Sequence, residues 1–276
     1  MLEVSVPAPI VAYLGSIPVS NAVIAAYVTT GFLVLLALYV RRRLSAVPGR
    51  AQAALELVFE YIDDQLTQAF GGKQEGRAFF PFVMTLLLFI ALANQLSLFP
   101  ILFQVLVEGK PLMRLATSDL SETLTLGLLV VLLSHVLALV ISPIRHIGGY
   151  IRIGALLKVR SFKDLGGALI ELFLGFMDII GEFAKIVSIS CRLFGNLFAG
   201  DVMVAVIISL STFTQFLVPI PFIFLGLFSG IVQAFVFTLL TIQFLAGPVN
   251  SARAHREERE EAKRETSPAE TVGVAV

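Results

Sequence analysis

The chain has 276 residues, of which 57% are hydrophobic and only 14% are charged, and its formal net charge is zero. Soluble globular proteins carry about 25% charged residues, because their surfaces face water. The composition therefore excludes a soluble domain and a disordered chain, implies no basic face for nucleic acid, and indicates a polytopic membrane protein.

The sequence shows no metal or cofactor site. Cys191 is the single cysteine, and the three histidines, His135, His146 and His255, are scattered without the spacing of metal ligands. The chain also lacks the zinc-binding His-Glu-x-x-His motif and a paired aspartate dyad. We expect no cofactor, no bound metal and no enzymatic activity of the chain on its own.

The whole chain is expected to form one membrane domain with an all-α fold. About 20 consecutive apolar residues cross the hydrocarbon core of a bilayer, and about five segments of this chain are long enough. A tail at 1–21 precedes the first of them. The predicted spans cover residues 22–40, 79–107, 120–142, 165–209 and 222–247.

Residues 51–70 have a different pattern. Leu55, Phe59, Ile62 and Leu66 recur at steps of three and four residues, while acidic residues occupy another face. This pattern predicts an amphipathic helix that lies along the membrane surface.

The last two spans are expected to pair as a long, strongly tilted helical hairpin. Pro248 is expected to end the second of them, because proline lacks the backbone N–H that continues a helix. Residues 248–276, which are rich in charges of both signs, are expected to form a charged tail.

The distribution of Lys and Arg predicts the orientation. Residues 41–77, 145–164 and 253–264 hold six, five and five of the twenty basic residues, whereas the N-terminal tail, 108–118 and 210–221 hold none, two and none. Connections on the cytoplasmic side of a membrane are enriched in Lys and Arg. We therefore expect five crossings, with the N-terminus outside and the C-terminus in the cytoplasm.

A row of ionisable residues marks the fourth predicted span. Glu171, Asp178, Lys185 and Arg192 recur every seven residues, close to two helical turns, and Glu182 joins the same stripe. Lys185 has Glu182 three residues before it, but Arg192 has no acidic residue three or four positions away. Because Arg stays charged, its partner is expected on another helix or another chain. The alternative is an arginine that reaches the membrane edge.

The run Ser190–Asp201, with Arg-Leu-Phe-Gly-Asn at its centre and Ala-Gly-Asp at its end, resembles subunit a of the F-type ATP synthases. Weaker matches to the same family lie at 94–100, 117–121 and 233–237. At 94–100, Ser97 replaces the glycine of the family pattern, and Ser121 replaces an asparagine of the next segment. The resemblance spans about residues 79–248.

This resemblance implies a stator subunit beside a rotating ring of c subunits. The partners that it implies are the c-ring, b-type peripheral stalk subunits, the rest of the F1Fo complex and the lipid bilayer, with no nucleic acid. Protons would reach the ring carboxylate through one of two offset half-channels and leave through the other, and rotation of the ring would drive ATP synthesis. The location implied by default is the bacterial inner or plasma membrane.

Arg192 is then the essential charge that faces the ring carboxylate, and Asn196 shares its face. Asp201 and Asp119 are candidates for the inlet half-channel, and Asp178, Glu182 and Lys185 for the outlet. Further lining residues are expected at Ser188, Gln233 and Gln243, and close helix packing at Gly195 and Gly200. The family often has a histidine near the position of Gly226, which this chain lacks.

Two alternatives remain open at this point. A secondary transporter or channel acting alone would share the span count and the buried charges, but would be expected to show inverted repeats or paired broken helices, and neither is visible. His135 lies in the middle of a predicted span, either as a buried histidine bonded to a neighbouring helix or as a proton relay.

Overall fold

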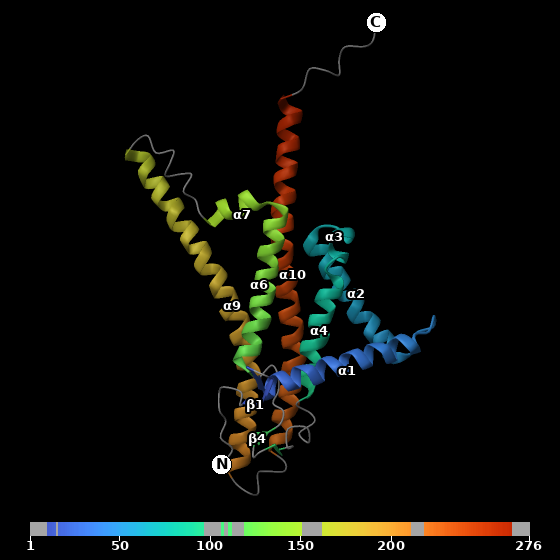
Figure 1. The fold of residues 1–276 in the computed structure, drawn as a ribbon. Coiled ribbons are helices and arrows are strands. Elements are labelled where there is room, and N and C mark those ends of the chain that lie inside the picture. Colours follow the sequence, from blue (N-terminus) through green and yellow to red (C-terminus); the bar gives the residue numbers. More distant parts are fainter. Residues whose placement is uncertain are drawn as a thin grey trace.

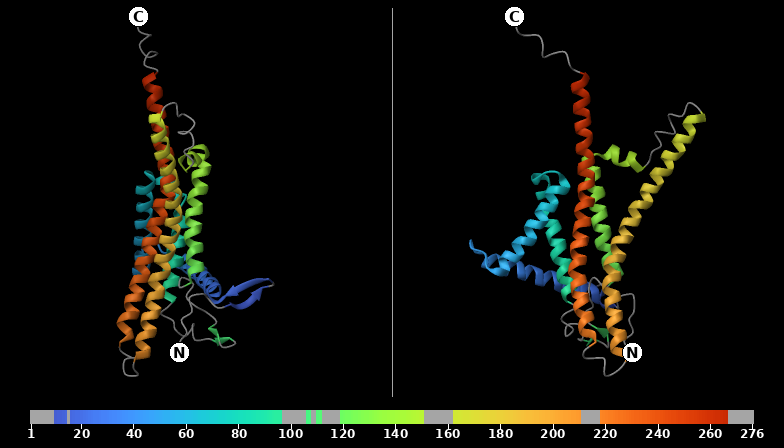
Figure 2. Two further views of the ribbon diagram at one scale, coloured as in Figure 1. Left: turned by 90° about the vertical axis from the view of Figure 1, so that its left-hand side faces the viewer. Right: turned by 180° about the vertical axis from the view of Figure 1, so that it is seen from behind.

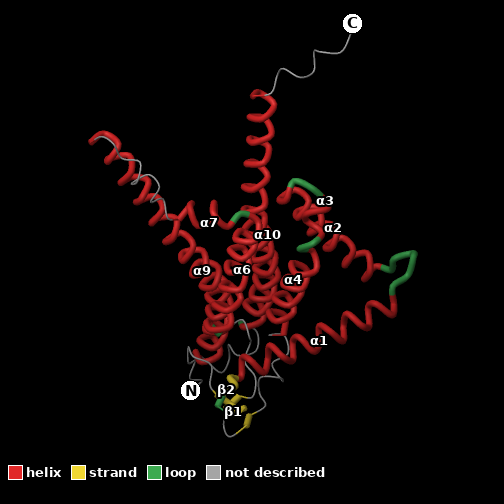
Figure 3. Tube along the Cα trace, turned by 45° about the horizontal axis from the view of Figure 1, so that its top comes forward, coloured by secondary structure: helices red, strands yellow, loops and turns green. Residues whose placement is uncertain are grey.

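The computed structural model describes residues 10–14, 16–96, 106–107, 110–111, 119–150, 162–210 and 218–266. Within these residues the fold is built of helices, with two small β-hairpins at one end (Figures 1 and 3). The protein is an all-α polytopic membrane protein.

Four helices form the central bundle. The two longest, α9 (Phe162–Leu210) and α10 (Pro219–Thr266), run as an antiparallel hairpin, and their far ends diverge (Figure 2). The helix α6 (Leu120–Ile141) packs against both, and α4 (Phe80–Gln95) packs against α10. The largest buried side chains of this bundle include Val83, Ile90, Val130, Leu193, Phe237 and Leu245.

Glycines allow the helices of the bundle to approach closely. A Cβ built on Gly230 of α10 would lie 3.0 Å from the Cβ of Asn94 on α4, and one built on Gly127 of α6 would lie 2.5 Å from the hydroxyl of Ser190 on α9. Asn94, only 1% exposed, donates from Nδ2 to the carbonyl of Gly230 at 2.9 Å. These contacts determine where along their lengths α4 packs against α10 and α6 packs against α9.

The N-terminal part lies apart from this bundle. The hairpin of β1 (Ile10–Leu14) and β2 (Ile17–Ser20) leads into α1 (Asn21–Arg43), where the Ser20 hydroxyl accepts from the backbone N–H of Val23. The helix α1 projects sideways, away from the bundle, and most of its apolar side chains are exposed (Figures 1 and 2). In the described chain it packs mainly on α4.

The predicted amphipathic helix is present as α2 (Arg50–Phe70). Its apolar face buries Ile62, Leu66 and Phe70 against the bundle, and its acidic face is mostly exposed. Gly71 ends the helix in the left-handed conformation, at φ 67°, and the short helix α3 (Lys73–Arg77) follows. Whether α2 lies along a membrane surface stays a prediction.

Within the predicted span 79–107, the described helix covers only the first part. The helix α4 ends at Gln95, and the strands β3 (Leu106–Val107) and β4 (Lys110–Pro111) pair beyond it; residues 97–105 lie outside the described part. The last polar side chains of α4 turn to α10, since Gln95 donates from Nε2 to the carbonyl of Leu227 at 3.1 Å. The apolar composition predicted more helix than the polar pair at its end allows.

Pro248, which is expected to close the last membrane span, does not end the helix. The helix α10 passes through Pro248 without a break and continues to Thr266. Proline leaves the carbonyl of Phe244 without its usual helical partner, which disfavours a helix interior. The continuation is therefore stabilised by something outside α10.

Contacts with α2 and α3 supply that stabilisation. Asn250 donates from Nδ2 to the carbonyl of Ala69 at 2.7 Å, and Arg253 donates from Nη1 to the carbonyl of Phe70 at 3.1 Å. Arg253 also pairs with Glu75 of α3. The extension of α10 thus satisfies carbonyls at the C-terminal end of α2 that its own helix leaves unpaired.

Three described helices are long and apolar enough to cross a membrane: α1, α6 and most of α10. The helix α4 is apolar but has only 16 residues, and α9 contains the row of charged residues. A last short helix, α7 (Pro143–Tyr150), folds back after α6 at the end of the bundle that also holds α3 (Figure 1).

Candidate functional site

Arg192 lies on the exposed face of α9, beside Cys191 and Ser188. The adjoining face, with Ile189 and Leu193, is buried in the core. Among the described residues, no carboxylate or other group pairs with the guanidinium of Arg192. The local sequence causes this arrangement, because apolar residues three and four positions apart turn one face inward and leave Arg192 on the other.

Arg192 is not at the edge of the bundle. Ser190, two residues before it, contacts α6 at Gly127, seven residues into that helix. At 1.5 Å per residue, this is about 10 Å from the first residue of a predicted span. An unpaired cation at such depth beside apolar surface is costly and is usually functional.

The surface around Arg192 is open. A Cβ built on Gly195 or Gly200 would meet no other atom within 4 Å, so neither glycine makes a close contact in the described chain. The close packing expected at these glycines is therefore absent within this chain, and packing against another chain stays a prediction. Exposed apolar side chains, among them Val187 and Met203, surround this surface.

Asn196 lies one turn beyond Arg192 and is tied to α10. Its Oδ1 accepts a hydrogen bond of 2.7 Å from the hydroxyl of Ser229. The amide NH₂ donates to no described residue. Asn196 can therefore offer hydrogen-bond donors to a group that approaches the open face.

The residues predicted for the inlet half-channel and Gln233 lie in different parts of the structure. Asp119 is 5% exposed and its Oδ1 accepts from the backbone N–H of Ser121 at 3.0 Å, so it caps the N-terminus of α6. Asp201 lies in α9, and its side chain is outside the described part. Gln233 of α10 is 7% exposed in the bundle. The structure does not bring these three together at one described cavity.

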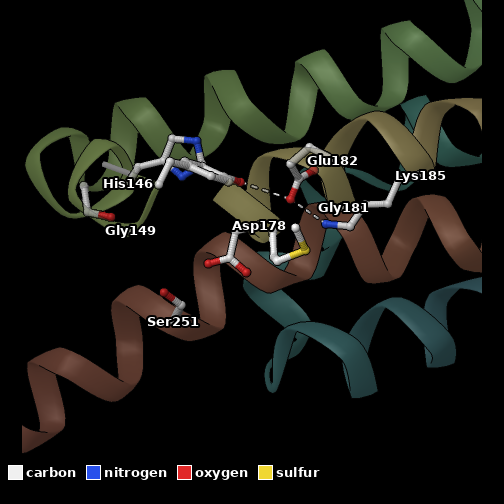
Figure 4. Close-up of a pocket in the computed structure, with 11 residues that line it drawn as sticks. His146, Gly149, Asp178, Gly181, Glu182, Lys185 and Ser251 are labelled. Carbon is white, nitrogen blue, oxygen red and sulfur yellow. Dashed lines mark hydrogen bonds and ion pairs between the residues drawn. The ribbon is translucent and has the colours of Figure 1, made fainter. Parts of the chain in front are cut away.

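The predicted outlet residues do meet at one cavity, of about 460 Å³. Asp178, Glu182 and Lys185 line it from α9, as Figure 4 shows. Polar residues from three other elements complete the lining: Ser142 after α6, His146 and Tyr150 of α7, and Ser251 of α10. The cavity lies toward the end of the bundle where α7 folds back.

Glu182 is the centre of this cavity. Its Oε1 accepts from the Tyr150 hydroxyl at 3.0 Å and from Lys185 Nζ at 2.6 Å, and its Oε2 lies 3.5 Å from His135 Nε2. Burial raises the pKa of the Tyr150 hydroxyl, and the nearby Glu182 carboxylate raises that pKa further, so Tyr150 remains a donor. The carboxylate is thus held by three groups from three helices.

Two further residues predicted to line the path, Gln243 and Ser188, lie in different places. Gln243 lines an adjoining cavity of about 280 Å³ together with His135, Glu182 and Lys185. Ser188 is exposed on the same face of α9 as Arg192. The ammonium of Lys185 also lies 5.4 Å from the centre of the Phe244 ring.

Sequence reasoning missed His146, Tyr150, Ser142 and Ser251 as lining residues. The side chains of α7 reach Glu182 because the chain turns back at Ser142 and Pro143. Proline directly after an apolar span, followed by a short segment with His and Tyr, was the available signal. The partner residues on α9, however, are more than 30 positions away, and the sequence does not show which helix α7 meets.

The arrangement has two polar features on one helix. A polar cavity reaches into the bundle from one end, and a permanent positive charge lies on an open face of the same helix. Comparison with known proteins agrees with this reading. The model of the family described as ATP synthase A chain matches residues 22–246.

Several relatives cover most of the chain. Subunit a of the ATP synthase of Moorella thermoacetica is 35% identical over 240 residues, 86% of this chain and 94% of the relative. The protein named ATP synthase subunit a, sodium ion specific, of Propionigenium modestum is 32% identical over 242 residues, 85% of this chain and 76% of the relative. ATP synthase subunit a of Syntrophobacter fumaroxidans is 31% identical over 228 residues, 82% of this chain and 84% of the relative. This chain belongs to the ATP synthase A chain family, whose members are subunits a of ATP synthases.

Proposed function

We propose that this chain is the ion-translocating stator subunit of a rotary F-type ATP synthase. The observation that carries the proposal is Arg192, a permanent charge on an open face of α9 without a partner in the described chain. Its partner is the carboxylate of each passing c subunit. The charge keeps that carboxylate ionised while it faces Arg192 and prevents a direct leak between two half-channels.

Two offset half-channels are part of the proposal. The outlet is the cavity around Glu182, with Asp178 and Lys185, and Gln243 lines an adjoining cavity. Ser188 belongs to the path on the exposed face of α9, one turn before Arg192. The inlet lies toward the opposite end of the bundle and includes Asp119, Asp201 and Gln233. Asn196 donates to the ring carboxylate as it reaches Arg192, and Gly195 and Gly200 leave room for the ring helices.

The remaining assignments follow from the same reading. The N-terminus lies outside and the C-terminus lies in the cytoplasm of a bacterial cell. The b-type stalk subunits hold the chain against the turning ring, and the complex couples ion flow to ATP synthesis. Because the relative from Propionigenium modestum is named sodium ion specific, flux is measured with and without Na⁺.

Substitution of Arg192 tests the proposal. In the assembled complex, Arg192→Ala is expected to abolish ATP synthesis driven by a pH difference, and to open a passive leak. Arg192→Lys is expected to fail as well, because a desolvated lysine can lose its proton and has no planar fork. Cys191→Ser, at the adjacent exposed position, is the matched control and keeps coupled synthesis. Full coupling in Arg192→Ala membranes would refute the role of Arg192.

Co-purification separates this function from a transporter acting alone. A small ring-forming protein with a carboxylate in mid-membrane is expected to accompany this chain. A cysteine placed at position 196, on the open face, is expected to crosslink to a cysteine near that carboxylate. Isolation of an active chain without such a partner would favour the transporter.

A further inference from the structure

Two histidines from different helices meet beside Glu182. His135 Nδ1 of α6 lies 3.2 Å from His146 Nε2 of α7, and His135 Nε2 lies 3.5 Å from Glu182 Oε2 of α9. His135 therefore engages both of its ring nitrogens. His146 lines the cavity of about 460 Å³. Glu182 lines the same cavity, so the three side chains form a row along its wall, from Glu182 Oε2 through His135 to His146.

The chemistry of the row fixes where its protons lie. His135 Nε2 faces an anionic oxygen, so in the neutral ring the proton resides on Nε2 and Nδ1 is an acceptor. His146 must then carry its proton on Nε2 and donate it to His135 Nδ1. Each group in the row is at once a donor and an acceptor, and this is the condition for passing a proton along it.

The surroundings of the pair come from four helices. From α7, the Tyr150 ring lies edge-on to both imidazoles, with centroids 6.0 and 5.1 Å away. From α9, the charged groups at the cavity are Asp178, Glu182 and Lys185, and α10 contributes the uncharged Ser251 and Gln243. Burial lowers the pKa of His146 below its ordinary value, and His135 lowers that pKa further, against the opposing effect of Glu182.

We propose that His135 and His146 form a proton relay between Glu182 and the water of this cavity. The inference rests on the proposed function and adds two residues to the outlet path. When Glu182 is protonated, its O–H faces His135 Nε2, so both rings carry their protons on Nδ1 and His135 donates to His146 Nε2. For release, the Glu182 O–H bond breaks and its proton bonds to His135 Nε2, while the His135 Nδ1 proton passes to His146 Nε2 and the His146 Nδ1 proton passes to water. Both rings are then protonated on Nε2, as they are beside the ionised carboxylate. Each hop breaks one O–H or N–H bond and forms another, so one proton is transferred in total.

The relay has a defined pH dependence. When the cavity pH is above the pKa of His146, His146 is neutral and can accept the next proton. When the cavity pH falls below that pKa, His146 already holds an extra proton, and release through the relay slows. Conduction toward the cavity is therefore expected to show an inflection set by His146.

The experiment uses the whole ATP synthase in liposomes. Passive proton conduction toward the cavity side is measured at a series of pH values on that side, for the unmodified complex, His135→Gln, His146→Gln and the matched control His255→Gln. We expect the inflection to be lost in His135→Gln and His146→Gln and to be kept in the control. Added imidazole is expected to restore conduction to His146→Ala more than to His135→Ala, because His146 faces the cavity. Unchanged pH profiles in both assembled Gln variants would overturn the relay.

A second measurement does not depend on the folding of the variants. Diethyl pyrocarbonate, applied to the His255→Gln complex, is expected to reduce conduction, and hydroxylamine is expected to restore it. Unchanged conduction after modification of His146, verified by mass spectrometry, would also overturn the relay. Neither result affects the stator function, which fails separately if Arg192→Ala remains coupled.

Discussion

At the scale of single residues, several polar side chains have hydrogen-bond or ionic partners within the described chain, whereas Arg192 has none. Glu182 receives Tyr150 and Lys185, and Asn94 donates to Gly230, so these polar groups are compensated inside the protein. Arg192 has no such compensation in the described chain. A membrane-embedded charge is retained at a cost, so we expect the group that compensates Arg192 to come from another chain.

Substitutions at Asn196 and at its partner Ser229 distinguish a structural role of Asn196 from a role in coupled ATP synthesis. Ser229→Ala removes only the hydrogen bond to Asn196 Oδ1, with an expected loss of about 1 kcal/mol in stability and little loss of coupled ATP synthesis. Asn196→Ala also removes the free amide donors, so synthesis is expected to fall more than in Ser229→Ala. Synthesis rates and thermal stability are measured on the assembled complexes. Equal loss of synthesis in the two variants would assign Asn196 a structural role alone.

At the scale of helices, close contacts set the packing of the bundle. Gly230 of α10 meets the Cβ of Asn94, which cannot rotate away, whereas Gly226, one turn earlier, meets no atom within 4 Å. Small residues of this kind allow membrane helices to approach closely. The two glycines therefore form a matched pair for a test of helix packing.

Gly230→Ala is expected to separate α4 from α10 and to destabilise the protein by about 1–3 kcal/mol, the usual cost of overpacking. It also lengthens the hydrogen bond from Asn94 to the Gly230 carbonyl. Gly226→Ala is expected to leave stability unchanged or slightly higher, because alanine favours a helix more than glycine by about 1 kcal/mol. Thermal unfolding in detergent measures both, and a greater loss in Gly226→Ala would contradict the packing described.

The helices also show what the sequence can predict. The amphipathic helix α2 matches its predicted range within one residue, because its period is a local property. The end of α4 and the passage of α10 through Pro248 depend on contacts between helices, which local rules do not include. The same holds at the cavity. Asp178, Glu182 and Lys185 share a helix and were found by their spacing, whereas His146 and Tyr150 reach them only through the fold.

At the scale of the whole molecule, the two ends of the bundle differ. The helices α3 and α7 and the C-terminal part of α10 lie at one end, and the strands β1 and β4 lie at the other (Figures 1 and 2). The basic residues Lys73 and Arg77 of α3 and the five of residues 253–264 in α10 belong to the first end. By the positive-inside rule, we expect this end to face the cytoplasm and the cavity around Glu182 to open there.

Topology reporters test this orientation. Fusions at Gly49, Gly148 and Ala262 are expected to report the cytoplasm, and fusions at Ile10 and Lys110 the outside, because alternate connections carry most of the Lys and Arg. The pair Ile10 and Gly49 is the most informative, since α1 lies between them and projects sideways from the bundle. If α1 crosses the membrane, the two positions lie on opposite sides. If both report the same side, α1 does not cross, the five-crossing arrangement is wrong, and the N-terminus follows the side on which Gly49 is found.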